Sequence, residues 1–314
     1  MSIKGKALRD AFGDEILELG RKNPNIYVID CDISKSCKTV PFSEELPMQH
    51  VNVGIAEQNA CGIAAGLATT GKTVFVSTYA VFGSMRMLEQ IRQEVCYTNL
   101  DVKIACSHGG LTPANDGASH QCVEDMGILR TIPGMTVIMG ADYHATRSLI
   151  RRAAERHGPV YLRFTRDEIP YVYDETIELE IGKAHKILDG DDISIIANGD
   201  TVCIALDAAN RLAENGIRAT LYDMHTIKPL DCDAVKECII KTGNIITVED
   251  HNIINGLGSA VCEVVAEFGK GKVKRIGVKD QFGESAPYQS LLALNGITAE
   301  SILSAAYKML ESRE

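Results

Sequence analysis

The sequence has no tryptophan, few aromatic residues and no long apolar run. Aromatic side chains make up 5% of the 314 residues, and no stretch approaches the ~20 apolar residues that a membrane-spanning helix needs. The first residues, MSIKGKALRDAFGDEI, lack the apolar segment of a signal peptide. A net charge of −10 argues against a nucleic-acid footprint or a polybasic membrane anchor. We therefore expect a cytoplasmic protein that binds neither nucleic acid nor membranes.

Two familiar kinds of site are also missing. None of the ten cysteines lies in a C-x-x-C pair, and several, such as Cys96, Cys106 and Cys262, stand in apolar stretches. They are expected to be buried reduced thiols, and no metal ligand is predicted on this chain. No G-x-G-x-x-G or Walker motif supports nucleotide binding. The INGLGSAV stretch at 254–261 is more typical of a tight turn.

Length and patterning predict an α/β protein of two doubly wound domains. In the first half, short β-rich runs alternate with helical stretches, which is typical of a parallel sheet covered by helices on both faces. In the segment 83–97, Met87, Ile91 and Val95 recur every four residues and would form one apolar helix face. The β-rich runs are 26–30, 73–77, 102–106, 135–139 and 159–164, and the other helical stretches include 57–69 and 142–156.

The alternation breaks at about 167–192, where the sequence is acidic, contains proline and is weakly periodic. This stretch is typical of a linker with room for an edge hairpin. A second α/β series follows, so we predict domains at 1–175 and 193–314 joined by a linker at 176–192. The second series has strands at 193–198, 217–223, 245–249 and 273–278 and helices at about 201–214, 231–241, 257–268 and 299–312.

Glu57 is the only carboxylate in the apolar and small-residue stretch VNVGIAEQNACGIAAG at 51–66. A carboxyl group surrounded by Val, Ile, Ala and Gly is hard to keep ionised, so it can hold or share a proton near neutral pH. The alternative is an acidic residue that favours the positive end of a helix dipole. An isolated Glu57 fits either interpretation.

Two further segments contain candidate site residues. In TYAVFGSMR, Tyr79 and Phe82 are three residues apart and would project from one face of a helical turn. After the run 102–106 comes a long polar loop with turn signals, in which His108 and His120 bracket Asp116. This position fits the ligand crevice at the carboxyl ends of parallel strands.

These stretches, taken in order, resemble the transketolase family of thiamine-diphosphate enzymes. They are similar to its carboxyl-terminal half, a pyrimidine-binding domain followed by a small C-terminal domain. The resemblance runs from about Arg9 to the end of the chain. It rests on GIAEQNACGIAAGLA, STYAVFGSMR, DGASHQCVEDMGILRTIPGMTVI, PVYLRFTRDEIP and MHTIKPLD.

The resemblance implies roles in cofactor binding. Glu57 would share a proton with a ring nitrogen of the cofactor's aminopyrimidine, and Tyr79 and Phe82 would stack on or flank that ring. A third aromatic residue often follows in the family, and here Met85 takes its place, whose thioether can fill the same space. Asp32 would support the cofactor pocket.

The resemblance also implies a channel for sugar phosphates. His108 and His120 would hold the donor's carbonyl and hydroxyl groups and assist proton transfer, and Asp116 would recognise a sugar hydroxyl. Arg9, Ser36 and Arg166 would contact the phosphate, since guanidinium groups bind it bidentately. Arg9 also lies on an amphipathic helix, where solvent exposure is common.

One part of the family's cofactor site is missing. The diphosphate and its Mg²⁺ or Ca²⁺ are bound in the family by a Gly-Asp-Gly motif and a downstream Asn, and this chain has no such pair in the required context. The resemblance therefore implies that a separate amino-terminal subunit binds the diphosphate and the metal. Two such pairs of subunits would form a heterotetramer.

Three functions remain open. The first is a transketolase subunit that transfers a two-carbon ketol unit between sugar phosphates. The second keeps the cofactor but resembles deoxyxylulose-phosphate synthase or the beta subunit of a 2-oxo acid dehydrogenase. The synthase normally has an Asp-Arg pair where this chain has Ser107-His108, which favours ketol transfer. The third is a non-catalytic regulatory subunit, which the joint presence of Glu57, His108, Asp116, His120 and Arg166 disfavours.

Overall fold

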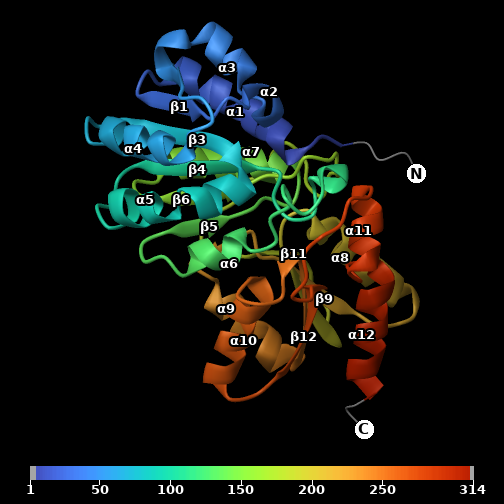
Figure 1. The fold of residues 1–314 in the computed structure, drawn as a ribbon. Coiled ribbons are helices and arrows are strands. Elements are labelled where there is room, and N and C mark those ends of the chain that lie inside the picture. The colour runs from blue at the N-terminus through green and yellow to red at the C-terminus, as the bar shows by residue number, and fades with distance from the viewer. Residues whose placement is uncertain (1–4, 312–314) are drawn as a thin grey trace.

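A seven-stranded sheet organises the first half of the chain. The computed structural model describes residues 5–311, so residues 1–4 and 312–314, at the outer ends of the two predicted domains, lie outside it. The strand order is β10-β5-β6-β4-β3-β1-β2, and all pairs are parallel except β10 with β5 (Figure 1). The strands are β1 (Ile26–Asp30), β2 (His50–Asn52), β3 (Thr73–Tyr79), β4 (Val102–Ser107), β5 (Thr136–Ile138), β6 (Val160–Arg163) and β10 (Thr226–Lys228).

Helices cover both faces of this sheet, as the predicted doubly wound architecture requires. Every residue of β4 is buried, which is the pattern of a parallel strand with helices on either side. The carboxylate of Asp142 accepts a hydrogen bond from Ala145 N–H at 2.8 Å and caps the start of α7. The helices are α1 (Leu8–Lys22), α2 (Ser34–Cys37), α3 (Val40–Glu45), α4 (Glu57–Ala68), α6 (Asp125–Arg130) and α7 (Tyr143–Glu155).

The predicted continuous helix at 83–97 is wrong in its geometry. This segment consists of a π-helical turn, η2 (Phe82–Arg86), one α-helical turn, α5 (Leu88–Gln90), and a second π-helical stretch, η3 (Ile91–Cys96). The expected apolar face survives, because Met87, Ile91 and Val95 are all fully buried. A spacing of four residues exceeds the 3.6 of an α-helix, and the wider π turns keep these side chains aligned. Such turns are frequent at functional sites.

A five-stranded sheet organises the second half, with the order β12-β11-β8-β9-β7. The strands β8, β9, β11 and β12 are parallel and lie where the sequence predicts them. The strands are β7 (His185–Leu188), β8 (Ile193–Ala197), β9 (Ala219–Asp223), β11 (Asn244–Asn252) and β12 (Lys272–Val278). The helices are α8 (Thr201–Glu214), α9 (Cys232–Lys241), α10 (Leu257–Phe268), α11 (Tyr288–Leu294) and α12 (Ala299–Glu311).

The predicted linker contributes structure to the second sheet. Within it, β7 forms an antiparallel edge strand against β9, so a single strand stands where the sequence left room for a hairpin. The domain boundaries themselves stay a prediction.

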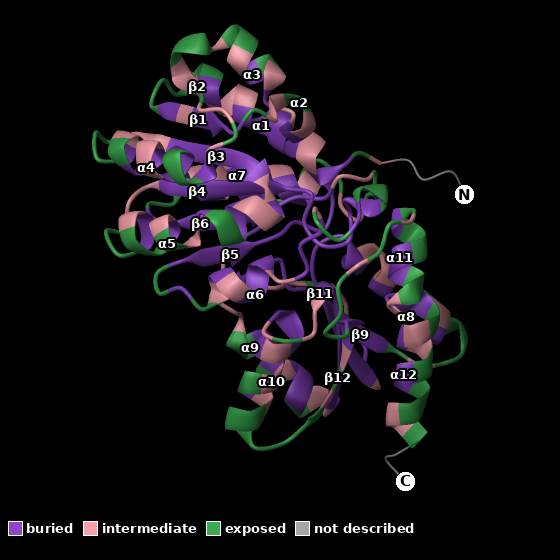
Figure 2. Ribbon diagram, viewed as in Figure 1, coloured by how far each residue is buried: buried purple, intermediate pink, exposed green. Residues whose placement is uncertain are grey.

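The two halves of the chain share an interface that is buried. From the second half, β10 crosses over and pairs with β5 of the first sheet. Figure 2 shows buried residues running through both sheets and through the region where they meet. Within residues 5–311, no helix is both long enough and apolar enough to cross a membrane.

Candidate active site

The carboxyl ends of the parallel strands bring most of the predicted site residues to one edge of the first sheet. β3 ends at Tyr79, β4 ends directly before His108, and β6 ends three residues before Arg166. Glu57 is the first residue of α4, which follows β2. This is the crevice position that the sequence predicts.

Glu57 is buried, with 2% of its surface exposed, and it has a cationic partner. Nη1 of Arg86 donates a hydrogen bond to Oε2 of Glu57 at 2.8 Å. The same guanidinium group lies 4.2 Å from the centroid of the Phe82 ring. The expectation of a purely apolar environment is therefore wrong, because Arg86 supplies a charge from η2. The sequence could have indicated that Arg86 lies beside Phe82, because residues four positions apart lie on one face of a helical turn.

Tyr79, Phe82 and the two histidines form one aromatic cluster. The Tyr79 and Phe82 rings stack with centroids 6.1 Å apart and an interplanar angle of 16°. The predicted shared helical turn is wrong, because Tyr79 ends a strand and only Phe82 lies in η2. The His108 ring lies 4.0 Å from Tyr79, and the His120 ring meets Phe82 edge-on at 5.9 Å. The stack and the histidines thus line the same part of the edge.

His108 is buried and neutral. Its Nδ1 lies 2.7 Å from the hydroxyl oxygen of Ser107, and its backbone adopts a positive φ of 61°. Burial, together with the nearby Arg9, Arg166 and His120, lowers the pKa of His108 to about 3. At neutral pH the imidazole can therefore accept or donate a hydrogen bond without carrying a charge.

The predicted phosphate contacts form two groups, and both arginines are near enough to His108 to affect its pKa. Nη1 of Arg9 donates to the backbone oxygen of Ser36 at 3.2 Å. Nη1 of Arg166 donates to Oδ2 of Asp116 at 3.0 Å, and both of these side chains are partly exposed. The structure thus brings together Arg9 with Ser36 and Arg166 with Asp116.

Asp32 and Met85 do not join these contacts. The Asp32 side chain is exposed and has no recorded partner within residues 5–311, and Met85 is 40% exposed. The buried carboxylate near this end of β1 is Asp30, which the sequence analysis missed. Its Oδ2 accepts hydrogen bonds from the hydroxyl groups of Ser34 at 2.8 Å and Thr39 at 2.7 Å, and His50 Nε2 lies 2.6 Å away. As the last residue of a predicted strand, Asp30 could have been singled out.

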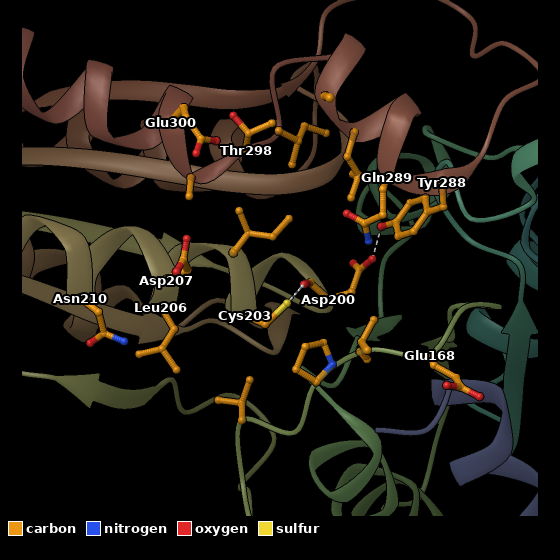
Figure 3. A pocket seen from close by; sticks show the side chains of 18 of the residues that line it. Glu168, Asp200, Cys203, Leu206, Asp207, Asn210, Tyr288, Gln289, Thr298 and Glu300 are labelled. Carbon is orange, nitrogen blue, oxygen red and sulfur yellow. Dashed lines mark hydrogen bonds between the residues drawn. The ribbon is translucent and has the colours of Figure 1, made fainter. Parts of the chain in front are cut away.

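A separate cavity of about 720 Å³ lies between residues 168–172, α8 and the α11–α12 segment (Figure 3). It contains none of the predicted site residues. Four acidic residues line it, Glu168, Asp200, Asp207 and Glu300. Among the described residues, no group of three or more His, Cys, Asp or Glu side chains is arranged to hold a metal ion.

The sequence of the chain matches two family models, one after the other. The pyrimidine-binding domain of transketolase matches residues 4–171, and the C-terminal domain of transketolase matches residues 182–302. The chain belongs to the transketolase family. The resemblance noted in the sequence is therefore confirmed, together with the fold class.

Known transketolase relatives agree with this assignment. A predicted transketolase C-terminal section from Methanocaldococcus jannaschii is 47% identical over 95% of this chain and 94% of its own length. A solved structure described as a split gene transketolase, an inactive beta4 tetramer, has a TM-score of 0.90 and 43% identity, and the match covers 98% of this chain and 99% of that one. The chain is thus a transketolase-type enzyme subunit.

A synthase of the same family is also similar. The 1-deoxy-D-xylulose-5-phosphate synthase 1 of Geobacter sulfurreducens is 38% identical over 96% of this chain but only 48% of its own length. Family membership therefore leaves the substrates to be argued from the site.

Proposed function

We propose that this chain is the pyrimidine-binding subunit of a thiamine-diphosphate-dependent transketolase that transfers a two-carbon ketol unit between sugar phosphates. The observation that carries the proposal is the arrangement at one sheet edge of a buried carboxylate, a pair of stacked aromatic rings and two histidines. Each of these groups has a separate task in such a transfer.

The side chains near Glu57 fit an aminopyrimidine ring. The ring needs a carboxylate at one nitrogen and aromatic faces beside it, and Glu57 with Tyr79 and Phe82 meets both needs. In the chain alone, the flat guanidinium group of Arg86 lies over Phe82 and pairs with Glu57, so it would have to move for the ring to bind there. When bound, the cofactor supplies the nucleophilic carbon that takes up the two-carbon unit. Glu57 would hold or release the proton of the aminopyrimidine.

The histidines and arginines suit a sugar-phosphate donor. His108, neutral at pH 7, would hydrogen-bond the donor's carbonyl or hydroxyl oxygen, and His120 would act from the other side of the aromatic pair. Arg9 and Arg166 would bind the phosphate, because guanidinium groups match its oxygens. Asp116, which pairs with Arg166 in the chain alone, would turn to a sugar hydroxyl. Asp32 and Met85 would line the cofactor pocket only if the partner chain covers them.

We propose that the diphosphate and its Mg²⁺ or Ca²⁺ are held by a separate amino-terminal subunit. The support is the missing Gly-Asp-Gly motif together with the two relatives that represent this half of a transketolase alone. A heterotetramer of two subunit pairs follows from the symmetry of the family. We place this complex in the cytoplasm, consistent with ten cysteines that form no disulfide.

Deoxyxylulose-phosphate synthesis is the second candidate, because a synthase matches nearly the whole chain. That reaction takes a 2-oxo acid as donor and releases carbon dioxide. The Ser107-His108 pair favours ketol transfer, since a neutral histidine presents a hydrogen-bonding group where the synthase would present a cation.

Reconstitution tests the proposal. The chain would be co-expressed with a chain of similar length that contains Gly-Asp-Gly and a downstream Asn, and two-carbon transfer would be assayed with ketose-phosphate donors. We expect transfer without release of carbon dioxide. Pyruvate decarboxylation with an aldose-phosphate acceptor would instead favour the synthase.

A matched pair of variants tests the role of Glu57 in the same complex. We expect Glu57→Ala to abolish hydrogen–deuterium exchange at the thiazolium carbon, because it removes the proton partner of the aminopyrimidine. Glu175→Gln, which changes an exposed carboxylate outside the site, should exchange at the normal rate. Normal exchange in Glu57→Ala would remove the proposed role.

A further inference from the structure

The loop between β4 and α6 carries three predicted substrate residues, and it lies against the second half of the chain. Within the first half, the loop contacts Tyr79 through His108 and Arg166 through Asp116, and the backbone oxygen of Phe164 accepts from Gly109 N–H at 3.1 Å. Further contacts that hold the loop come from β11 and from the segment 283–288. The following inference rests on the proposed function, because it concerns how the same site is positioned.

Asp250, on β11, makes the central contact. It is buried, with 2% exposed, and its two carboxylate oxygens lie 3.0 and 3.2 Å from the backbone nitrogen of Leu111, which donates to them. Leu111 stands three residues after His108. A carboxylate that accepts a backbone N–H bond in a buried place makes a strong, directional attachment.

The loop fits against Asp250 without spare room. Gly110 has a positive φ of 64°, and a Cβ atom there would lie 2.0 Å from Oδ2 of Asp250. Behind the loop, Nη2 of the buried Arg163 donates to the backbone oxygen of Asp250 at 2.8 Å, and its Nε pairs with Asp125 at 3.2 Å. Asp250 is therefore held on its backbone side while its carboxylate faces the loop.

The far end of the loop is held by the segment 283–288. Nε2 of Gln121, the residue after His120, donates to the backbone oxygen of Glu284 at 2.9 Å. A Cβ atom at Gly117, the residue after Asp116, would lie 2.6 Å from the hydroxyl oxygen of Ser285. Each of the three predicted substrate residues thus stands within three positions of a contact with the second half.

Tyr288 supports Asp250 from behind. Its hydroxyl group lies 3.2 Å from Oδ2 of Asp250 and also contacts Asp200, next to the cavity of Figure 3. A tyrosine hydroxyl has one proton, so it donates to one of these two carboxylates at a time. Tyr288 thereby links the anchor of the loop to the start of α11.

The neighbouring Glu249 shows what a purely structural carboxylate does here. It is fully buried and also accepts two backbone N–H bonds, from Leu257 at 2.7 Å and Gly258 at 2.8 Å. Both bonds hold the start of α10, inside the second half. Glu249 therefore resembles Asp250 as a buried carboxyl group that accepts backbone N–H bonds, but its bonds go to α10 and not to the loop.

We propose that Asp250 is a positioning residue for the active site: through Leu111 it fixes the loop that carries His108, Asp116 and His120. The C-terminal domain then has a defined part in the reaction. It sets where the substrate-contacting side chains stand, although it contributes none of them.

Hydrogen exchange on the full chain alone tests the attachment without any activity. Asp250→Asn replaces one acceptor oxygen with a donor group, which weakens the attachment of the buried Leu111 N–H. We expect amide exchange within 109–121 to accelerate about tenfold, which corresponds to about 1.4 kcal/mol. Glu249→Gln should accelerate exchange at the start of α10 and leave 109–121 unchanged. Equal exchange of 109–121 in Asp250→Asn and the parent chain would overturn the proposal.

Kinetics of the reconstituted complex test the consequence. A loop out of position raises KM for the donor, whereas a merely less stable chain lowers the amount of active enzyme and leaves KM unchanged. We expect Asp250→Asn to raise donor KM about tenfold while exchange at the thiazolium carbon stays normal. An unchanged KM with kcat reduced as in Glu249→Gln would contradict the positioning role.

Two further outcomes are distinguishable. Tyr288→Phe removes the hydroxyl group that contacts both Asp250 and Asp200, and it leaves the Asp250 carboxyl group in place. It should shift exchange and KM in the same direction by a smaller factor, so it carries the test if Asp250→Asn does not fold. An unchanged loop in Tyr288→Phe together with an unfolded Asp250→Asn counts against the proposal. A parent complex that transfers no two-carbon unit refutes the proposed function. The amide exchange of 109–121 in the chain alone tests separately whether Asp250 holds the loop.

Discussion

Replacing Arg86 with methionine removes the cation that Glu57 faces in the chain alone. Glu57 is 2% exposed and Arg86 is 46% exposed, with 2.8 Å between Oε2 and Nη1. Breaking a fully buried pair costs about 3–5 kcal/mol, and an exposed pair is worth about 0–1 kcal/mol. This pair lies between those limits, and the contact with Phe82 adds about 0.5–1 kcal/mol. We therefore expect Arg86→Met to lower the free energy of unfolding by about 2 kcal/mol.

A double-mutant cycle measures the pair directly. Arg86→Met, Glu57→Gln and the double variant would be unfolded in urea as isolated chains. Because Glu57→Gln removes the buried charge, the double variant should recover most of the loss caused by Arg86→Met. Arg92→Met is the matched control, since Arg92 is exposed and its recorded side-chain bond goes to Gln93. It should change stability by less than about 0.5 kcal/mol.

The reasoning fails if the two substitutions are additive. A coupling free energy below about 0.5 kcal/mol is the level expected of distant, independent sites. Such a result would mean that water, and not Arg86, compensates the carboxylate of Glu57. The proposal that Arg86 must leave Glu57 before the aminopyrimidine binds would then lose its support.

Three other predictions follow from the site and its surroundings. The isolated chain should bind thiamine diphosphate weakly or not at all, and tight magnesium-dependent binding by calorimetry would refute the division of the site between two subunits. Arg166→Ala in the complex should weaken the binding of phosphorylated donors by ~1.5–3 kcal/mol. Arg218 is exposed and paired with Asp191, so Arg218→Ala should leave donor binding unchanged. An equal loss of binding with unphosphorylated donors would contradict the phosphate role of Arg166. Burial raises the pKa of Asp223 to about 8, so between about pH 4 and 8 the folded chain holds a proton that the unfolded chain releases. The free energy of unfolding should therefore fall as pH rises through this window, by up to about 1.4 kcal/mol per pH unit. Urea unfolding at pH 6, 7 and 8 should show a smaller pH dependence of this free energy in Asp223→Asn. The same pH dependence in both chains would show that Asp223 is already ionised.

The strands were predictable because parallel strands buried on both faces appear as continuous apolar runs. IYVID at 26–30 and ISIIA at 193–197 are such runs, and both are strands in the structure. The short strands β2, β7 and β10 were not predicted individually. β10 has three residues and exists because it pairs with β5, which lies far away in the sequence. No local pattern can report such a pairing.

The site was predictable to the extent that its residues follow strand ends in a fixed order. His108 and Arg166 each stand two residues after an apolar run, 102–106 and 159–164, so their place at the sheet edge could be inferred. Tyr79 and Phe82 were paired for the wrong reason, because a helical turn was assumed where a strand ends and a π turn begins. The stack still forms, since the strand end and the turn bring the two rings together.

What the sequence analysis missed has a common physical form. Asp30 with His50, Glu57 with Arg86 and Asp250 with Leu111 are contacts of a buried carboxyl group with a residue 20, 29 or 139 positions away. A local pattern reports whether a segment is buried, but a charge stays buried only where the fold brings it a partner. At Glu57 the sequence correctly indicated a buried carboxylate but missed its charged partner, Arg86. Asp250 stands in the half of the chain where no site residue was predicted, and its contact with Leu111 joins that half to the substrate loop.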